Sequence, residues 1–153
     1  MSLTDEERSA LVTYKIEKAN KTLEQVKTII PMEYWEMAAN RLYYAAYYAV
    51  SALLLKNGFS VQTHQGIIHV FGQNFIKTNK LDGKFGTLYG RLFSLRQTGD
   101  YGDTFDLTAE DVVPLLAPTE ELINTISSII YYVKAALIVE HLHCYHRTGF
   151  RVG

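Results

Sequence analysis

The sequence has few of the residues that mark a cross-linked, secreted or membrane-spanning protein. Its single cysteine, Cys144, cannot form an internal disulfide. The longest apolar run, from Leu42 to Leu55, is broken by tyrosines and is shorter than the roughly 18 residues of a membrane-spanning helix. The first residues, MSLTDEERS, are polar and acidic where a secretory signal would be basic and then apolar. We therefore expect a cytoplasmic protein that does not associate with membranes.

The sequence also lacks a large excess of either positive or negative charge. The net charge of −1 excludes a protein that coats nucleic acid non-specifically, although a local basic site stays open. The glycines form no phosphate-binding loop, and no serine, cysteine or carboxylate pair has a recognisable nucleophilic arrangement. We therefore expect neither a conventional hydrolase nor a cofactor.

Apolar residues make up 48% of the 153 residues, which is enough for one domain with its own core. Three prolines, few alternating stretches and long helical periodicities predict an all-α protein of five or six helices. We assign residues 1–140 to one helical domain and residues 141–153 to a histidine-rich tail.

Helix boundaries follow from capping residues and breakers. A capping box at Thr4 predicts a first helix to about residue 30, and a second runs from Pro31 to the stop at Asn57-Gly58. Further helices are expected at about 63–75, at 82–98 with GDYGD as the stop, and from Thr108 onward, where two prolines, Pro114 and Pro118, would kink or split the last helix.

The second predicted helix is apolar on nearly every side, which is typical of a helix at the centre of a bundle. One side would stay thin because it carries only alanines, and hydroxyl groups on the helix would need partners if buried. The alanines are Ala38, Ala45, Ala49 and Ala52, and the hydroxyls belong to Tyr43, Tyr44, Tyr47 and Ser51.

Arg96 lies near the middle of the apolar arc of its helix. A charge on a packing face is costly unless paired, so Arg96 either pairs with Asp100 or Asp103 or lines a pocket or subunit interface. It could also simply offset the dipole at the end of its helix.

Arg41 raises the same question, because the second helix offers it no exposed side. Its helical neighbours include Tyr44 and Tyr48. Together the two arginines indicate an anion site, whereas a purely structural Arg41 would pair with Glu17, Glu36 or Asp103.

Three stretches, NRLYYAAYYAVSALLLKNG, THQGIIHVFGQNFIKTNKL and LYGRLFSLRQTGDYGD, resemble the HEPN superfamily in their order and spacing. The resemblance covers about residues 5–135. It implies an antiparallel helical bundle that forms homodimers, binds RNA or a nucleotide, and is often encoded beside a minimal nucleotidyltransferase in toxin–antitoxin-like pairs.

Active ribonucleases of that superfamily carry an arginine, four to six residues and then a histidine, near the dimer interface. Here Arg96 is followed at that spacing by Tyr101. A tyrosine with a pKa of about 10 is a poor base at neutral pH. His64, at a helix start that would keep it neutral, could serve as the base instead, or could merely cap or pack. His69 is expected in the core.

Tyr101 has two further interpretations: its hydroxyl could accept a nucleotidyl group from a partner enzyme, or its ring could pack over the second helix. The tail HLHCYHR has zinc-like spacings but no obvious fourth ligand, so no metal is expected. Three functions follow: a nucleotide- or RNA-binding module, an atypical metal-independent endoribonuclease, or a purely structural dimer. The catalytic candidates are Arg96, Tyr101 and His64, and the ligand-binding candidates are Arg41, Tyr44, Tyr48, Arg96, Asp100 and Asp103.

Overall fold

The computed structural model describes residues 2–101 and 106–147, with side chains at 2–100 and 106–132. Within these ranges the chain is helical and contains no strand, as predicted. The segments are α1 (Asp5–Ile29), the 3-10 turn η1 (Ile30–Met32), α2 (Trp35–Lys56), α3 (His64–Phe71), the π-helical turn η2 (Gly72–Ile76), α4 (Gly83–Tyr101), the single turn α5 (Ala109–Val112), the 3-10 turn η3 (Val113–Leu115) and α6 (Leu116–Arg147).

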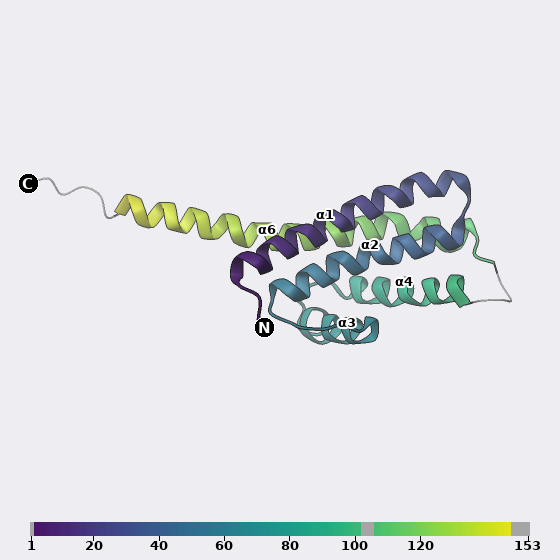
Figure 1. Ribbon diagram of the computed structural model, residues 1–153, viewed down its shortest axis with the longest axis horizontal. Coiled ribbons are helices and arrows are strands. Elements are labelled where there is room, and N and C mark those ends of the chain that lie inside the picture. Colours follow the sequence, from purple (N-terminus) through teal and green to yellow (C-terminus); the bar gives the residue numbers. More distant parts are fainter. Residues whose placement is uncertain (1, 102–105, 148–153) are drawn as a thin grey trace, which may run out of the picture.

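The four long helices α1, α2, α4 and α6 form an antiparallel bundle (Figure 1). Helix α2 lies at its centre and packs against α1, α4 and α6, while the short α3 covers the C-terminal part of α2. The central position predicted for α2 is therefore confirmed. None of the described helices is both long and apolar enough to cross a lipid bilayer.

The alanines of α2 lie in the core, as predicted. Ala38, Ala45, Ala49 and Ala52 are all fully buried. The hydroxyl of Ser51 is buried as well, and among the described residues it has no hydrogen-bond partner, contrary to the expectation that each buried hydroxyl would find one.

The expectation that α2 has no exposed side is wrong. Because α1 and α4 contact different sides of α2, a line of its side chains between them stays partly open to solvent. We call this line the open stripe; its residues, spaced three or four apart, are Met37, Asn40, Arg41, Tyr44, Tyr47 and Tyr48.

Most predicted helix ends are confirmed. Thr4 forms a capping box with Glu7, the Thr63 hydroxyl accepts a hydrogen bond from the Gly66 amide at 3.0 Å, and Gly58 has the left-handed φ of 83° that stops α2. Pro31, however, lies in the separate turn η1, and α2 begins only after Glu33, whose φ is 61°.

Helix α4 continues past its predicted end at Thr98 and includes Gly99 and Asp100. Gly99 fits here because it lies against other parts of the fold: a Cβ atom would be 3.2 Å from Leu107 Cδ1 and 3.7 Å from Glu36 Cα. The missing side chain therefore serves close packing rather than a turn.

The expected split near Pro114 is confirmed, since η3 separates α5 from α6. Helix α6 then continues without a break to Arg147, so the backbone shows no boundary at residue 141. The division into a domain and a tail stays a prediction.

Candidate functional site

Arg96 lies on the inner side of α4, with 16% of its side chain exposed. Its Nε atom pairs with Asp100 Oδ2, one turn later, at 3.1 Å. Its guanidinium carbon is 5.3 Å from the ring centre of Tyr43 and 5.2 Å from that of Tyr44. Within the part of the chain whose side chains are described, the two terminal nitrogens make no hydrogen bond, so Asp100 satisfies only one edge of the group.

Arg41 projects from the open stripe of α2. Its Nε and Nη2 atoms donate to Asn40 Oδ1 at 3.3 Å and 3.0 Å, and its guanidinium carbon is 5.1 Å from the ring centre of Tyr44. Neither Glu17 nor Glu36 pairs with it. Glu36 instead accepts a hydrogen bond from the Leu107 amide at 3.0 Å, so this acidic group is used to hold the chain after α4.

The two arginines therefore converge on one tyrosine ring. We call Arg41, Tyr44 and Arg96 the arginine cluster. Cation–π contacts with Tyr44 hold the two positive groups near each other without a carboxylate between them and the ring. Asn40 joins the two arginines to Asp100, because its Nδ2 lies 3.5 Å from Asp100 Oδ1 while its Oδ1 binds Arg41.

His64, the first residue of α3, lies beside this cluster. Its Nδ1 atom is 2.6 Å from the Tyr43 hydroxyl, and its ring is 5.0 Å from that of Tyr47 and 6.0 Å from that of Tyr44. Burial, and after it the positive charge of Arg96, lowers the pKa of His64 below its ordinary value of 6.5. The imidazole is therefore neutral at pH 7, as its place at a helix start had suggested, although the causes differ.

Tyr43 links Arg96 to His64 and was not among the predicted site residues. It is fully buried, and its burial raises the pKa of its hydroxyl to about 12, so this group keeps its proton at neutral pH. Its ring stacks on that of Tyr89, with the ring centres 5.9 Å apart. The Tyr89 hydroxyl is also buried and has no hydrogen-bond partner among the described residues. The sequence showed only that the Tyr43 hydroxyl needed a partner.

The other candidates are only partly placed. Tyr48 lies in the open stripe and contacts Lys18, whose ammonium group is 4.7 Å from its ring centre. The Tyr101 side chain, Asp103 and the side chains of HLHCYHR lie outside the described residues. His69 is exposed, so the expectation that it packs in the core is wrong. Of the residues with described side chains, no three His, Cys, Asp or Glu come together as metal ligands.

The site thus combines a fixed positive charge, a neutral imidazole and accessible aromatic rings. The arginine cluster could hold a phosphate, and the tyrosine rings could stack on a base. A neutral histidine next to the arginines is the pair of groups that metal-free phosphoryl chemistry requires. Three helices supply these groups, so tertiary packing sets their relative positions.

The chain is similar to known proteins over most of its length. A family model described as "HEPN domain" matches residues 12–130. A "UPF0332 protein" of Thermotoga maritima is 35% identical over 130 residues, which cover 85% of this chain and 98% of that protein. Two proteins of Methanocaldococcus jannaschii that bear the name "Putative toxin" are 37% identical over 101 residues and 27% identical over 111 residues. These matches cover 66% and 72% of this chain and 69% and 82% of those proteins.

Proposed function

The chain belongs to the HEPN domain family, and from that premise we propose that its arginine cluster binds the phosphate of a nucleotide or of RNA. The observation that carries this proposal is the convergence of Arg41 and Arg96 on the ring of Tyr44, at 5.1 Å and 5.2 Å. Both groups keep nitrogens for a phosphate because, among the described residues, Arg41 forms no ion pair and Asp100 binds only one edge of Arg96.

Partner proteins belong to the same proposal. The name "Putative toxin" of two relatives supports a role in a toxin–antitoxin-like pair. The family resemblance supports a minimal nucleotidyltransferase as the other member and a homodimer as the working form. Co-purification of the two gene products and sedimentation of the isolated protein test these two points.

Binding at the cluster is tested by isothermal titration of the protein with a nucleoside monophosphate and with a short RNA. We expect Arg41→Ala and Arg96→Ala each to weaken binding by roughly 10- to 150-fold, the effect of losing one charge-assisted hydrogen bond of about 1.5–3 kcal/mol. Arg91→Ala is the matched control, because Arg91 is an exposed arginine on the same helix as Arg96. Equal affinity of all four proteins would contradict the proposal.

A second candidate function is a metal-independent endoribonuclease. It is favoured by one contact, the 2.6 Å distance between His64 Nδ1 and the Tyr43 hydroxyl. Because the Arg96 guanidinium lies over the ring of the same tyrosine, this contact places a histidine and an arginine beside each other. In this candidate the 2′ oxygen attacks the adjacent phosphorus and the P–O5′ bond breaks, which gives a 2′,3′-cyclic phosphate and a 5′-hydroxyl that takes its proton from water. His64 accepts the proton of the 2′-hydroxyl at Nε2, which is unprotonated in the tautomer whose Nδ1–H donates to the Tyr43 hydroxyl, and Arg96 stabilises the developing negative charge.

Incubation of RNA with the protein in EDTA tests this candidate. We expect cleavage that is lost in His64→Ala and Arg96→Ala, with a rate that rises with pH and levels off below the ordinary histidine pKa of 6.5, because the pKa of His64 is lowered. Absence of cleavage by the unaltered protein, or cleavage by His64→Ala and Arg96→Ala at the rate of the unaltered protein, leaves the binding function alone.

A further inference from the structure

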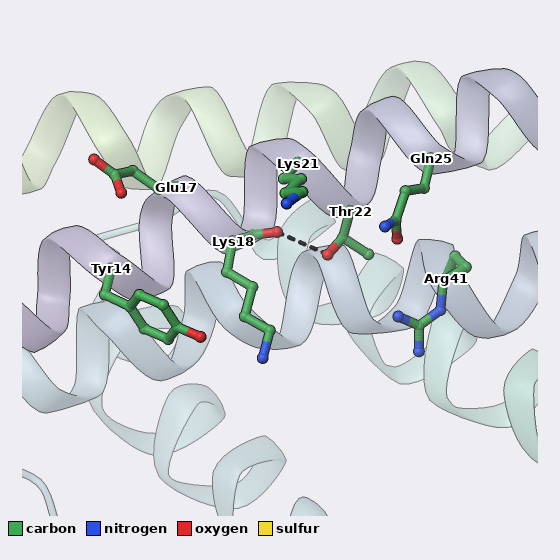
Figure 2. Close-up of a pocket in the computed structure, with 7 residues that line it drawn as sticks. All are labelled: Tyr14, Glu17, Lys18, Lys21, Thr22, Gln25 and Arg41. Atoms are coloured by element: carbon green, nitrogen blue, oxygen red, sulfur yellow. Dashed lines mark hydrogen bonds between the residues drawn. The ribbon is translucent and has the colours of Figure 1, made fainter.

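A groove on the surface of α1 begins at the arginine cluster. It has a volume of about 380 Å³ and shares Arg41 with the cluster. Figure 2 shows its lining, which consists of six residues of α1 and one of α2: Tyr14, Glu17, Lys18, Lys21, Thr22, Gln25 and Arg41. We call it the α1 groove.

Positive charge dominates this groove, since three basic residues and one acidic residue line it. Within the described part of the chain, Lys18, Lys21 and Arg41 form no ion pair. In Figure 2 the Lys18 side chain extends from α1 toward α2, the helix that carries Arg41, whereas the Glu17 carboxylate points away from both cations. The groove therefore offers uncompensated cations to a ligand.

Aromatic rings accompany these cations. The Lys18 ammonium group is 4.7 Å from the ring centre of Tyr48 and 5.7 Å from that of Tyr14. Tyr14 is 55% exposed, so its ring is open to solvent beside the Lys18 ammonium group. Tyr48, and after it Tyr14, raises the pKa of Lys18, which keeps its positive charge.

The rings also connect the groove to the cluster. Along the open stripe, the ring of Tyr48 lies 6.1 Å from that of Tyr44 and 5.5 Å from that of Tyr47, and Tyr47 in turn contacts His64. Cations and rings thus form a continuous series of contacts from Arg96 through Tyr44 and Tyr48 to Lys18 and Tyr14.

Resting on the proposed function, we propose that the α1 groove binds single-stranded RNA that extends beyond the nucleotide held by the arginine cluster. Single strands expose both phosphates and base faces, and proteins bind them with basic grooves and stacking rings. A duplex hides its base faces, so its bases cannot stack on the ring of Tyr14. An acidic peptide would use the cations but not an open ring.

Length dependence distinguishes the two sites, because a mononucleotide reaches only the cluster. We would measure binding of a nucleoside monophosphate and of a 2′-O-methyl oligouridylate of roughly eight nucleotides, within the usual range of single-strand sites. The methyl group prevents cleavage through the 2′ oxygen. The variants are Lys18→Ala and Tyr14→Ala, with Lys27→Ala as the control, because Lys27 pairs with Glu24 and with Glu120 of α6, outside the groove.

We expect Lys18→Ala to weaken oligonucleotide binding by roughly threefold to tenfold and to lower its salt slope by about one, the change for one lost phosphate contact. Tyr14→Ala should weaken it at an unchanged salt slope. Neither variant should alter binding of the monophosphate, and Lys27→Ala should alter neither.

Three results would overturn the inference. The first is that Lys18→Ala and Lys27→Ala bind the oligonucleotide with equal affinity. If Arg41→Ala still weakens binding of the monophosphate in that case, the α1 groove is refuted and the arginine cluster is not. The second is equally tight binding of a duplex with the same loss in Lys18→Ala. The third is a change of oligomeric state in Lys18→Ala, by sedimentation, without a change in RNA affinity, which would make the groove a contact between copies.

Discussion

His64 is the residue whose chemistry depends most on its surroundings. Its imidazole contacts the Tyr43 hydroxyl on one side and faces Arg96 across the same tyrosine ring. Both burial and the arginine favour the neutral form. The guanidinium thus acts on the histidine as well as on a ligand, and removing it changes two properties at once.

Arg96→Ala should therefore raise the pKa of His64, measured by NMR titration of its ring protons. The value should stay below 6.5, because burial is the larger cause of the shift and is retained. Arg91→Ala should leave the titration unchanged. A His64 pKa that does not move in Arg96→Ala would show that the two groups are not coupled, whether or not the protein cleaves RNA.

At the scale of single helices, α3 is the element that positions His64. It is only eight residues long, and its N-terminus is fixed by the Thr63 hydroxyl, which caps the Gly66 amide. Gly66 is required here by contact: a Cβ atom would lie 2.7 Å from Thr63 Oγ1 and 2.8 Å from Val61 Cγ1. The cap and the glycine therefore form one unit.

Gly66→Ala should break this cap and destabilise the protein by about 0.5–2 kcal/mol, the usual cost of losing an N-cap. Gly72→Ala, at the residue directly after the end of α3, is the control. Its φ of −60° is helical and nothing lies within 4 Å of an added Cβ, so it should be neutral or stabilise by up to about 1 kcal/mol. Urea unfolding measures both, and equal stability of the two variants would refute the role of Gly66.

These helices also show what the sequence could predict. Local signals were sufficient at Thr4, Thr63 and Gly58, where the cap or the left-handed residue lies within a few positions of the helix end. They failed at Glu33 and Gly99. The break before α2 falls on a non-glycine residue, and α4 passes through a glycine that packs against Leu107, a tertiary contact with no local signature.

The candidate site could likewise be predicted only in part from the sequence. Helical periodicity predicted that Arg96 and Arg41 lie on packing faces, where a positive charge needs a partner. Both lie in the arginine cluster. The contact of His64 with Tyr43 depends on how α3 packs on α2, and the Lys18 contact depends on α1. No periodicity within one helix contains that information.

At the scale of the whole molecule, α6 extends beyond the bundle to which it belongs (Figure 1). The last buried core residue among the described side chains is Ile130, and the helix continues to Arg147. In Figure 1 the C-terminal turns of α6, coloured yellow, run beyond the ends of the other helices. Among the described side chains, the core therefore extends along α6 as far as Ile130.

A chain that ends at Tyr132 should thus keep a melting temperature within about 4 °C of the full chain, corresponding to roughly 1 kcal/mol. Ile130→Ala in the full chain is the contrasting variant and should cost about 2–5 kcal/mol, because it empties a buried position. Circular dichroism melts compare them. A shortened chain that melts as early as Ile130→Ala would place residues 133–153 in the folding unit.

The full burial of Tyr43 has one more consequence. Its ring packs with Tyr89 and Phe93 in the interior while carrying Arg96 and His64 at the surface. The same ring belongs to both environments, so the proposed anion site depends on the packing of the interior. On heating, the ability to hold a ligand and the helical signal should disappear together in a single cooperative transition.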